Sequence, residues 1–217
     1  MRAIYSFVGM SGVGKSHWSK KLAELGYDIY SIDDLIAQKL QKLIKKFSIT
    51  NDINYSKSNV GDLAKWMGFP DDERYKQNSK KYLEMESKVV QSVLNKALKS
   101  KKNTIIDTTG SVIYINKNVL KALKKSTNVV YFDSPASHLK SMFEEFKRNP
   151  KPIIWGNIYK PLRGEKEEKA LLRCYKELID FRIKHYERLA DITIPYKWQY
   201  DRKRKVAEIE KKILKNI

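Results

Sequence analysis

One segment near the start of the chain has residue types and a spacing suited to binding a nucleotide phosphate chain. It reads Gly9-Met10-Ser11-Gly12-Val13-Gly14-Lys15-Ser16 and fits the pattern G-x-x-x-x-G-K-[ST] at every fixed position. The glycines let backbone N–H groups converge on an anion, and a helix beginning here adds its positive end. Lys15 is therefore expected at the β- and γ-phosphates of ATP, and the Ser16 hydroxyl at Mg²⁺.

Two residues outside this pattern are further candidates for nucleotide contact. His17 follows the pattern directly, although an early helix position more often places a side chain on the surface or against the sheet. Arg148 borders a predicted lid, and planar bidentate recognition of phosphate favours Arg over Lys. A solvated helix face accounts for Arg148 equally well.

Acidic residues follow the second and third apolar segments, where ligands bind if these segments are strands of a parallel sheet. Asp33 is a candidate to accept a proton from an acceptor hydroxyl or to hold it by hydrogen bonding, and helix capping is the alternative. Asp34 is a second candidate for the acceptor but fits a first-turn helix residue better. Asp107 resembles a Walker-B carboxylate that orients Mg²⁺ or its water shell. Asp133, after the fourth segment, is more easily explained by a turn.

Other polar residues extend the candidate acceptor site. Thr109 and Gly110 follow Asp107 directly, and a glycine there lets backbone N–H groups approach a ligand. Arg182, in a late helical segment, is a candidate to stabilise charge on the transferred phosphoryl group, and a solvated helix face accounts for it equally well.

The elements that would position these residues alternate along the chain. Five short segments rich in β-branched and aromatic residues predict strands at Ala3–Val8, Tyr27–Ile32, Thr104–Ile106, Val129–Phe132 and Ile192–Ile194. Amphipathic patterns predict helices at Ser16–Leu25, Leu35–Phe47, Tyr82–Leu98, Val119–Leu123, Leu139–Phe146 and Ala170–Leu189. This alternation predicts a three-layer α/β/α fold with a parallel sheet, as one domain over residues 1–217.

Three regions depart from this alternation. Residues 48–79 are polar, contain an exposed-looking Trp66, and predict an insertion over the site. Residues 149–168 combine proline and glycine with basic side chains, which predicts a mobile lid. Residues 201–217 carry apolar positions at helical spacing and predict a packed terminal helix.

Composition narrows the class of protein. The single cysteine, Cys174, excludes an intramolecular disulfide and agrees with a reducing cytosol. The first eight residues are too short and too interrupted for a signal peptide, and no apolar run approaches the roughly 20 residues needed to span a membrane. We therefore expect a cytoplasmic monomer or weak dimer. The net charge of +19 is compatible with nucleic acid, but the lysines are spread along the chain, which makes a small-molecule partner the preferred expectation.

Four segments together resemble the shikimate kinase family within the nucleoside-monophosphate-kinase-like P-loop group. They are Gly9–Ser16, Ser31-Ile32-Asp33-Asp34-Leu35-Ile36, Lys151-Pro152-Ile153-Ile154 and the stretch from Phe181 to Asp191. The resemblance implies a five-stranded parallel sheet in the order 2-3-1-4-5 and ATP- and Mg²⁺-dependent transfer to a hydroxyl. It also implies that Asp33 and Arg182 contact the acceptor, that Lys15 and Ser16 serve ATP and Mg²⁺, and that Lys151 takes the place of the lid arginine.

The departures from the family pattern fall on the acceptor side. Ser31 stands where the family has an acidic residue, Leu83 where it has the arginine that binds the substrate carboxylate, and residues 107–111 replace its glycine-rich loop. We therefore predict a kinase with an altered acceptor. A nucleotide or nucleoside kinase, a nucleic-acid-binding ATPase or polynucleotide kinase, and a sensor that binds ATP without transfer remain alternatives.

Overall fold

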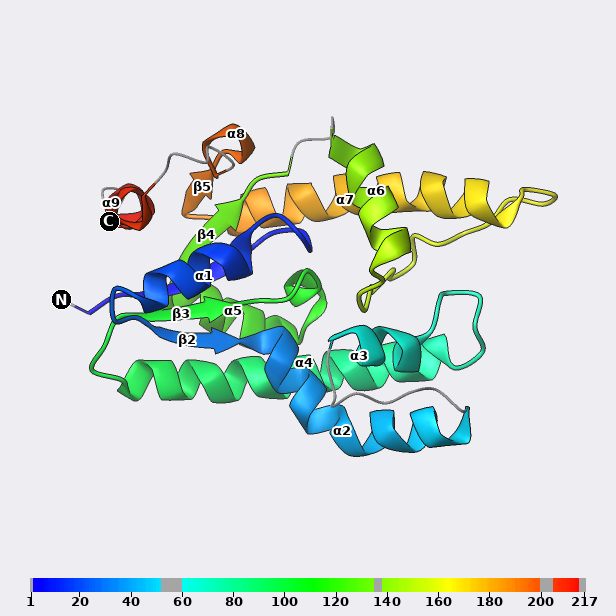
Figure 1. Cartoon of the computed structure of the whole chain (residues 1–217), viewed down its shortest axis with the longest axis horizontal. Coiled ribbons are helices and arrows are strands. Elements are labelled where there is room, and N and C mark those ends of the chain that lie inside the picture. Colours follow the sequence, from blue (N-terminus) through cyan, green and yellow to red (C-terminus); the bar gives the residue numbers. More distant parts are fainter. Residues whose placement is uncertain (1, 52–59, 135–137, 200–204, 215–217) are drawn as a thin grey trace.

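The computed structural model of the chain describes residues 2–51, 60–134, 138–199 and 205–214 (Figure 1). Its strands are β1 (Ile4–Val8), β2 (Asp28–Ser31), β3 (Thr104–Asp107), β4 (Asn128–Phe132) and β5 (Ile192–Ile194). Its helices are α1 (Lys15–Ala23), α2 (Ile32–Thr50), α3 (Val60–Met67), α4 (Tyr75–Lys99), the 3₁₀ turn η1 (Val112–Tyr114), α5 (Lys117–Ser126), α6 (Leu139–Arg148), α7 (Glu167–Leu189), α8 (Tyr196–Gln199) and α9 (Val206–Leu214).

The strands form one parallel sheet in the order β2-β3-β1-β4-β5. This confirms the predicted fold class and strand order. The central strand β1 is buried along its whole length, which explains its nearly continuous run of apolar residues. Ile32 was predicted to end the second strand, but it opens α2, because Ser31 acts as the N-cap of that helix.

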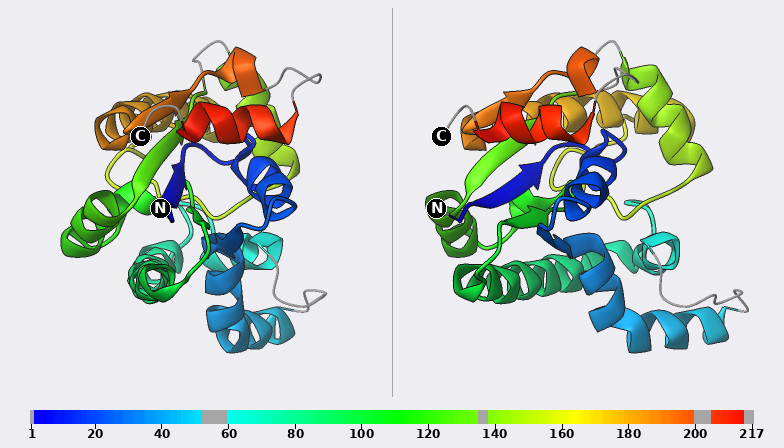
Figure 2. Two further views of the ribbon diagram at one scale, coloured as in Figure 1. Left: turned by 90° about the vertical axis from the view of Figure 1, so that its left-hand side faces the viewer. Right: turned by 60° about the vertical axis from the view of Figure 1, so that its left-hand side comes forward.

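Helices cover both faces of the sheet (Figure 2). α1 and α9 pack together on one face, and α4, α5 and α7 lie on the other. The strands all run in the same direction, so their carboxyl ends meet at one edge. α6, α3 and the first turns of α4 extend beyond this edge and surround the ends of the strands (Figure 1).

The predicted insertion at residues 48–79 contains the end of α2, all of α3 and the first turns of α4. α3 packs against both α2 and α4, and Leu63, Trp66 and Met67 are buried there. The expectation of an exposed Trp66 is therefore wrong: it is 4% exposed, because the apolar face of a short helix is turned toward its neighbours. Residues 52–59 of this region lie outside the described part of the chain.

The predicted lid and tail are described in part by the structure. Between Arg148 and Glu167 the chain forms neither helix nor strand, yet Ile154 and Trp155 are buried. Movement of this segment stays a prediction. In the predicted tail helix, α9 begins at Val206, and Ile209 and Ile213 are buried; residues 201–204 and 215–217 lie outside the described residues.

Candidate functional site

The phosphate loop joins β1 to α1 and needs glycine where the sequence has it. Gly9 has a φ of 142°, and a Cβ atom there would lie 2.7 Å from the carbonyl oxygen of Phe132. Gly14, the residue before α1, has a φ of 100° in the left-handed region. Side chains at these positions would strain or displace the loop. Because glycine has none, the backbone N–H groups of the loop are free to approach an anion.

Lys15 is held inside this loop. Its Nζ donates hydrogen bonds to the carbonyl oxygens of Gly9 and Met10, both at 2.9 Å. Burial lowers the pKa of the Lys15 ammonium, while the nearby carboxylates of Asp107 and Asp33 oppose that shift. A phosphate oxygen at the loop would give the ammonium a charged partner in place of two carbonyls.

Ser16 and Asp107 supply oxygen atoms suited to Mg²⁺. Asp107 ends β3 and is 5% exposed; burial raises the pKa of its carboxyl, and Lys15 and a hydrogen bond from the Ser16 hydroxyl lower it. Within the described residues no three His, Cys, Asp or Glu side chains group as metal ligands. Mg²⁺ is commonly held by one or two protein oxygens together with substrate phosphates and water, and the oxygen atoms of Ser16 and Asp107 fit that ion.

Asp33 lies in the first turn of α2, where it borders the main cavity of the site. The capping alternative does not apply to it, because the Ser31 hydroxyl accepts the N–H of Asp34. The hydroxyl of Tyr82, on α4, lies 3.4 Å from Asp33 Oδ1. Burial raises the pKa of the Asp33 carboxyl, and the positive charge of Lys15 opposes the shift. Asp34 is exposed and does not line the cavity.

The loop after β3 is fixed by a buried carboxylate on α4. Glu86 is fully buried and accepts hydrogen bonds from the hydroxyls of Thr109 and Ser111. Burial raises the pKa of Glu86 to about 7, and the two hydroxyl hydrogen bonds oppose that rise. The hydroxyl of Thr109, a predicted acceptor residue, is therefore engaged by Glu86, while Thr109 lines the cavity.

Arg182 reaches the same cavity from α7 although it is only 3% exposed. Its Nη2 donates to the carbonyl oxygen of Ile154 at 2.8 Å, and its guanidinium carbon lies 5.4 Å from the centre of the Tyr114 ring. Its Nη1 lies 3.2 Å from where a Cβ atom of Gly110 would be. The Nε of Arg182 is buried and has no hydrogen-bond partner among the described residues.

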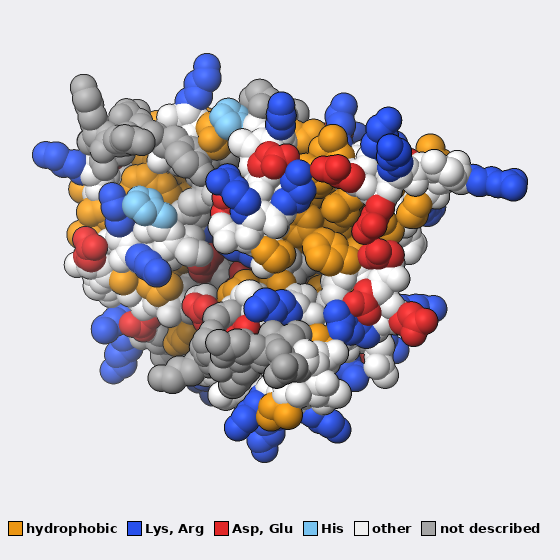
Figure 3. Space-filling view, turned by 45° about the vertical axis from the view of Figure 1, so that its right-hand side comes forward, with side chains coloured by type: hydrophobic (Ala, Val, Ile, Leu, Met, Phe, Trp, Pro, Cys, Tyr) orange, Lys and Arg blue, Asp and Glu red, His pale blue; other side chains and the backbone are white. Residues whose placement is uncertain are grey.

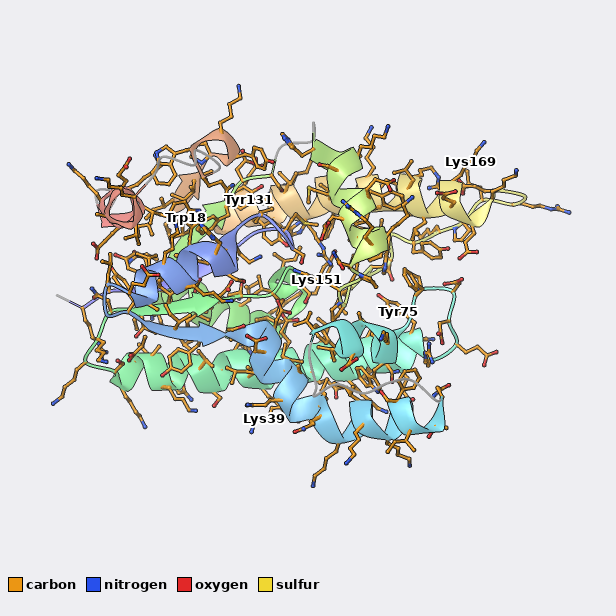
Figure 4. All side chains as sticks on the ribbon, viewed as in Figure 1. Trp18, Lys39, Tyr75, Tyr131, Lys151 and Lys169 are labelled. Atoms are coloured by element: carbon orange, nitrogen blue, oxygen red, sulfur yellow. The ribbon has the colours of Figure 1, made fainter. Side chains whose placement is uncertain are left out.

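The predicted lid borders this cavity through Lys151, Pro152 and Ile153. Tyr75 on α4 anchors it: its hydroxyl donates to the Ile153 carbonyl oxygen at 3.0 Å and accepts from the Trp155 N–H at 2.8 Å. Tyr75 and Lys151 both lie between the α6–α7 layer and the α2–α3–α4 layer (Figure 4). The Lys151 charge affects the pKa of Lys15, Asp33 and Asp107, so it is part of the same charged cluster.

The cavity, of about 230 Å³, brings half of the predicted site residues together, and Lys15, Ser16 and Asp107 lie outside its lining. Those lining it are Ser11, Gly12, Val13, Asp33, Thr109, Gly110, Lys151 and Arg182. His17 is exposed and stands edge-on to Trp18, and Arg148 is exposed and paired with Glu145. Neither borders this cavity. The side of the molecule turned forward in Figure 3 shows hydrophobic side chains grouped near basic and acidic ones.

Sequence reasoning missed several residues of the site. Glu86 is the most informative, because an acidic residue on the otherwise apolar face of a long helix is a signal for a buried partner. Tyr82, one helical turn earlier, lines the cavity. Tyr186 donates to the carbonyl oxygen of Gly110 at 2.5 Å. Leu83, compared above with the family arginine, lines a different cavity, so that position does not face Asp33.

The sheet order and the phosphate loop define the fold of a P-loop kinase. A family model described as an AAA domain matches residues 4–149, more than half of the chain. The chain therefore belongs to this AAA domain family. Among curated proteins no sequence matches it.

Solved structures show the same fold at low sequence identity. The shikimate kinase from Acinetobacter baumannii in complex with shikimate has a TM-score of 0.59 and 16% identity, over 99% of this chain and 92% of that one. The shikimate kinase from Bacteroides thetaiotaomicron has a TM-score of 0.58 and 15% identity, over 98% and 95%. The dephospho-CoA kinase from Campylobacter jejuni has a TM-score of 0.50 and 16% identity, over 99% and 95%. The predicted shikimate-kinase-like fold is confirmed.

A membrane-spanning role finds no support in the helices. Within the described part of the chain, none combines the length and the apolar character needed to cross a bilayer.

Proposed function

We propose that the protein transfers the γ-phosphoryl group of ATP·Mg²⁺ to a hydroxyl group of a small molecule that is not shikimate. The observation that carries this proposal is the place of Asp33: its carboxylate borders the same cavity as the phosphate loop and Arg182. A hydroxyl beside Asp33 would therefore face the end of a phosphate chain bound at the loop.

The charges around this point suit phosphoryl transfer. Arg182 supplies positive charge at the cavity and Lys15 supplies it inside the phosphate loop. Donors that are already in place stabilise the transferred group without reorganisation. Bound Mg²⁺, held through Ser16 and Asp107, would neutralise charge on the β- and γ-phosphates. Because phosphoryl transfer has a loose transition state, catalysis rests mainly on positioning and on these charges.

Asp33 has two tasks in this scheme. Its carboxylate orients the acceptor hydroxyl by accepting its hydrogen bond, and it receives the proton as the new bond forms. Burial raises the pKa of Asp33 and so brings it closer to neutral pH, where a base works best. The Tyr82 hydroxyl, at 3.4 Å, is placed to hold the carboxylate in one orientation.

The acceptor half differs from what a shikimate carboxylate needs. Leu83 lines another cavity, and the Asp107 carboxylate brings negative charge close to Asp33, whose pKa it raises. Arg182 already donates to Ile154 and stacks on Tyr114. The family pattern has two arginines at the acceptor. Here a small anionic polyol would meet only Arg182, which already contacts Ile154 and Tyr114.

The test is ADP release from ATP·Mg²⁺ with a panel of polyols, nucleosides, nucleotides and shikimate. Turnover with a hydroxyl compound other than shikimate, lost in Lys15→Ala, is the expected result. Efficient turnover of shikimate would contradict the altered acceptor. Absence of ADP release with the whole panel, in a protein that still binds ATP, would favour a sensor.

A further inference from the structure

We propose that the acceptor carries a flat apolar body next to its reactive hydroxyl, and that a wall formed by Phe146, Ile153 and Tyr175 binds this body. The inference rests on the proposed function and names the class of compound that the same cavity takes. The observation behind it is that these three side chains line the cavity that also contains Asp33.

The cavity has two ends, and the direction of phosphoryl transfer assigns them. The attacking and leaving oxygens lie roughly in line on opposite sides of the transferred group. Asp33 and Thr109 follow β2 and β3, on one side of the phosphate loop, and mark the acceptor end. Ser134 and Tyr196 lie two residues beyond the ends of β4 and β5, on the other side of the loop, and mark the nucleoside end. Phe146 also follows β4, but it lies in the last turn of α6, so its contacts decide to which end it belongs.

The partners of the wall place it at the acceptor end. The Ile153 carbonyl accepts from Tyr75 on α4, the helix that also carries Tyr82 beside Asp33. Tyr175 precedes Arg182 by seven residues, or two turns, on α7, so both side chains share one face of that helix.

Phe146 connects the wall to the insertion. Its ring meets that of Phe69, from the loop between α3 and α4, edge to face with centroids 5.8 Å apart. The loop from the acceptor side of the sheet thus supports the wall from outside. Through this contact the predicted insertion supports the wall.

The wall is formed before any ligand arrives. The rings of Phe146 and Tyr175 stack at 5.5 Å with an interplanar angle of 13°. Trp155, which is 2% exposed, packs against both from behind, at 6.5 Å and 6.2 Å. A preorganised aromatic surface loses little side-chain entropy on binding, and covering it releases water from apolar area.

Polar and apolar groups are thereby divided within one acceptor site. Asp33 and Arg182 recognise the oxygen atoms, and the wall matches a ring or another flat hydrocarbon part. A compact polyol would reach Asp33 but leave the wall against water, so it would lose the binding energy of that surface.

The experiment compares acceptors in matched pairs that differ only in the flat substituent. The pairs are ethanol with 2-phenylethanol, glycerol with 3-phenoxypropane-1,2-diol, and ribose with adenosine. Binding to the full chain is measured by calorimetry with Mg²⁺ and a non-hydrolysable ATP analogue, so that the readout does not depend on turnover. In the first two pairs we expect the phenyl member to bind about tenfold or more tightly than its partner.

Two variants connect any preference to the wall. Ile153→Thr makes one lining residue polar, and Leu172→Thr makes the same kind of change at a residue of α7 that is 43% exposed. We expect Ile153→Thr to reduce the preference for the phenyl member about tenfold and Leu172→Thr to leave it unchanged.

Each result decides the matter. Equal binding within every pair, no binding of any phenyl compound, or a preference that survives Ile153→Thr overturns the inference. A preference confined to adenosine also overturns it, because the wall would then recognise a nucleobase instead of an apolar body. A preference for phenyl compounds that Ile153→Thr removes, without any phosphoryl transfer, supports the inference and contradicts the proposed kinase activity.

Discussion

The phosphate half and the acceptor half of the cavity are built in different ways. The phosphate half is one continuous segment, Gly9–Ser16, whose shape follows from glycines with positive φ and from the helix that begins at Lys15. The acceptor half gathers side chains from α2, α4, α6, α7 and the loops after β3 and α6. Its geometry depends on hydrogen bonds between these elements, such as those of Glu86 and Tyr75.

The phosphate half is a local site formed by one segment, and the acceptor half is a tertiary site formed by elements distant in the chain. A local anion site keeps its chemistry when the rest of the domain diverges, because backbone N–H groups and one lysine are enough. A site made from several elements changes when any one of them changes, and here Leu83 and Thr109 depart from the family pattern. Substitutions in the phosphate half should therefore abolish ADP release. Substitutions in the acceptor half should change kcat or the acceptor KM and leave ATP binding unchanged.

Replacing Lys15 should have the largest effect. Lys15→Ala removes the one buried ammonium that the phosphate loop encloses, so we expect ADP release to fall about 10³-fold. Lys20→Ala, at an exposed position of the same helix, should keep activity within a factor of two. Turnover by Lys15→Ala within tenfold of wild type would show that the loop does not hold the reacting phosphates.

Asp33→Asn should come next and should act on the other half. The amide keeps the shape but cannot take the acceptor proton, so kcat should fall about 10²-fold while the affinity for a non-hydrolysable ATP analogue is unchanged. Asp34→Asn is the matched control, because its side chain is exposed and outside the cavity. Equal losses in both variants would remove the distinction between the two carboxylates.

Glu86→Gln tests the buried carboxylate through pH. The folded-state pKa of Glu86 is raised to about 7, so the stabilisation that it gives is complete below its ordinary pKa and is lost as pH rises through about 7. The wild type should therefore lose up to about 3 kcal/mol of unfolding free energy by pH 8, relative to the glutamine variant. Thermal unfolding at pH 5 and pH 8 measures this.

The control for that variant is Glu84→Gln, at an exposed position of the same helix. It should show the pH dependence of the wild type. If Glu86→Gln and wild type lose the same stability between pH 5 and pH 8, Glu86 is ionised at both values. The raised pKa of Glu86 would then be wrong.

Tyr75→Phe should have the smallest effect of the four. It leaves the Trp155 N–H and the Ile153 carbonyl without their hydroxyl partner, which costs about 1–3 kcal/mol of stability. We expect the KM of the acceptor to rise several-fold and the KM of ATP to stay constant. Tyr159→Phe, whose hydroxyl has no hydrogen bond to the described residues, is the control. A rise in both KM values would show that the hydrogen bonds of Tyr75 affect ATP binding as well as acceptor binding.

The sequence predicted the fold and the position of the glycine-rich segment well, because both depend on local patterns. Strand predictions such as Val129–Phe132 differ from the structure by one residue, and the glycine-rich segment lies between β1 and α1 as expected. The order of the strands came from the family resemblance, since local periodicity carries no information about which strands are neighbours.

The acceptor half was predicted less completely, for a physical reason. Whether Trp66 is buried, or which atoms Glu86 contacts, depends on elements far away in the chain. The pattern identified Asp33, but only the structure shows Ser31 as the cap of α2 and Tyr82 beside the carboxylate. Residues such as Arg148 were selected by position near a predicted lid, and its ion pair with Glu145 could not be read from that position.

The most direct test of the central claim is the fate of the labelled γ-phosphoryl group of ATP in a mixture of protein, Mg²⁺ and acceptor. The account predicts that the label appears in a phosphate ester of the acceptor and that Asp33→Asn prevents its formation. Label found only in inorganic phosphate, at the same rate with and without acceptor, would contradict transfer to a hydroxyl and would identify an ATPase.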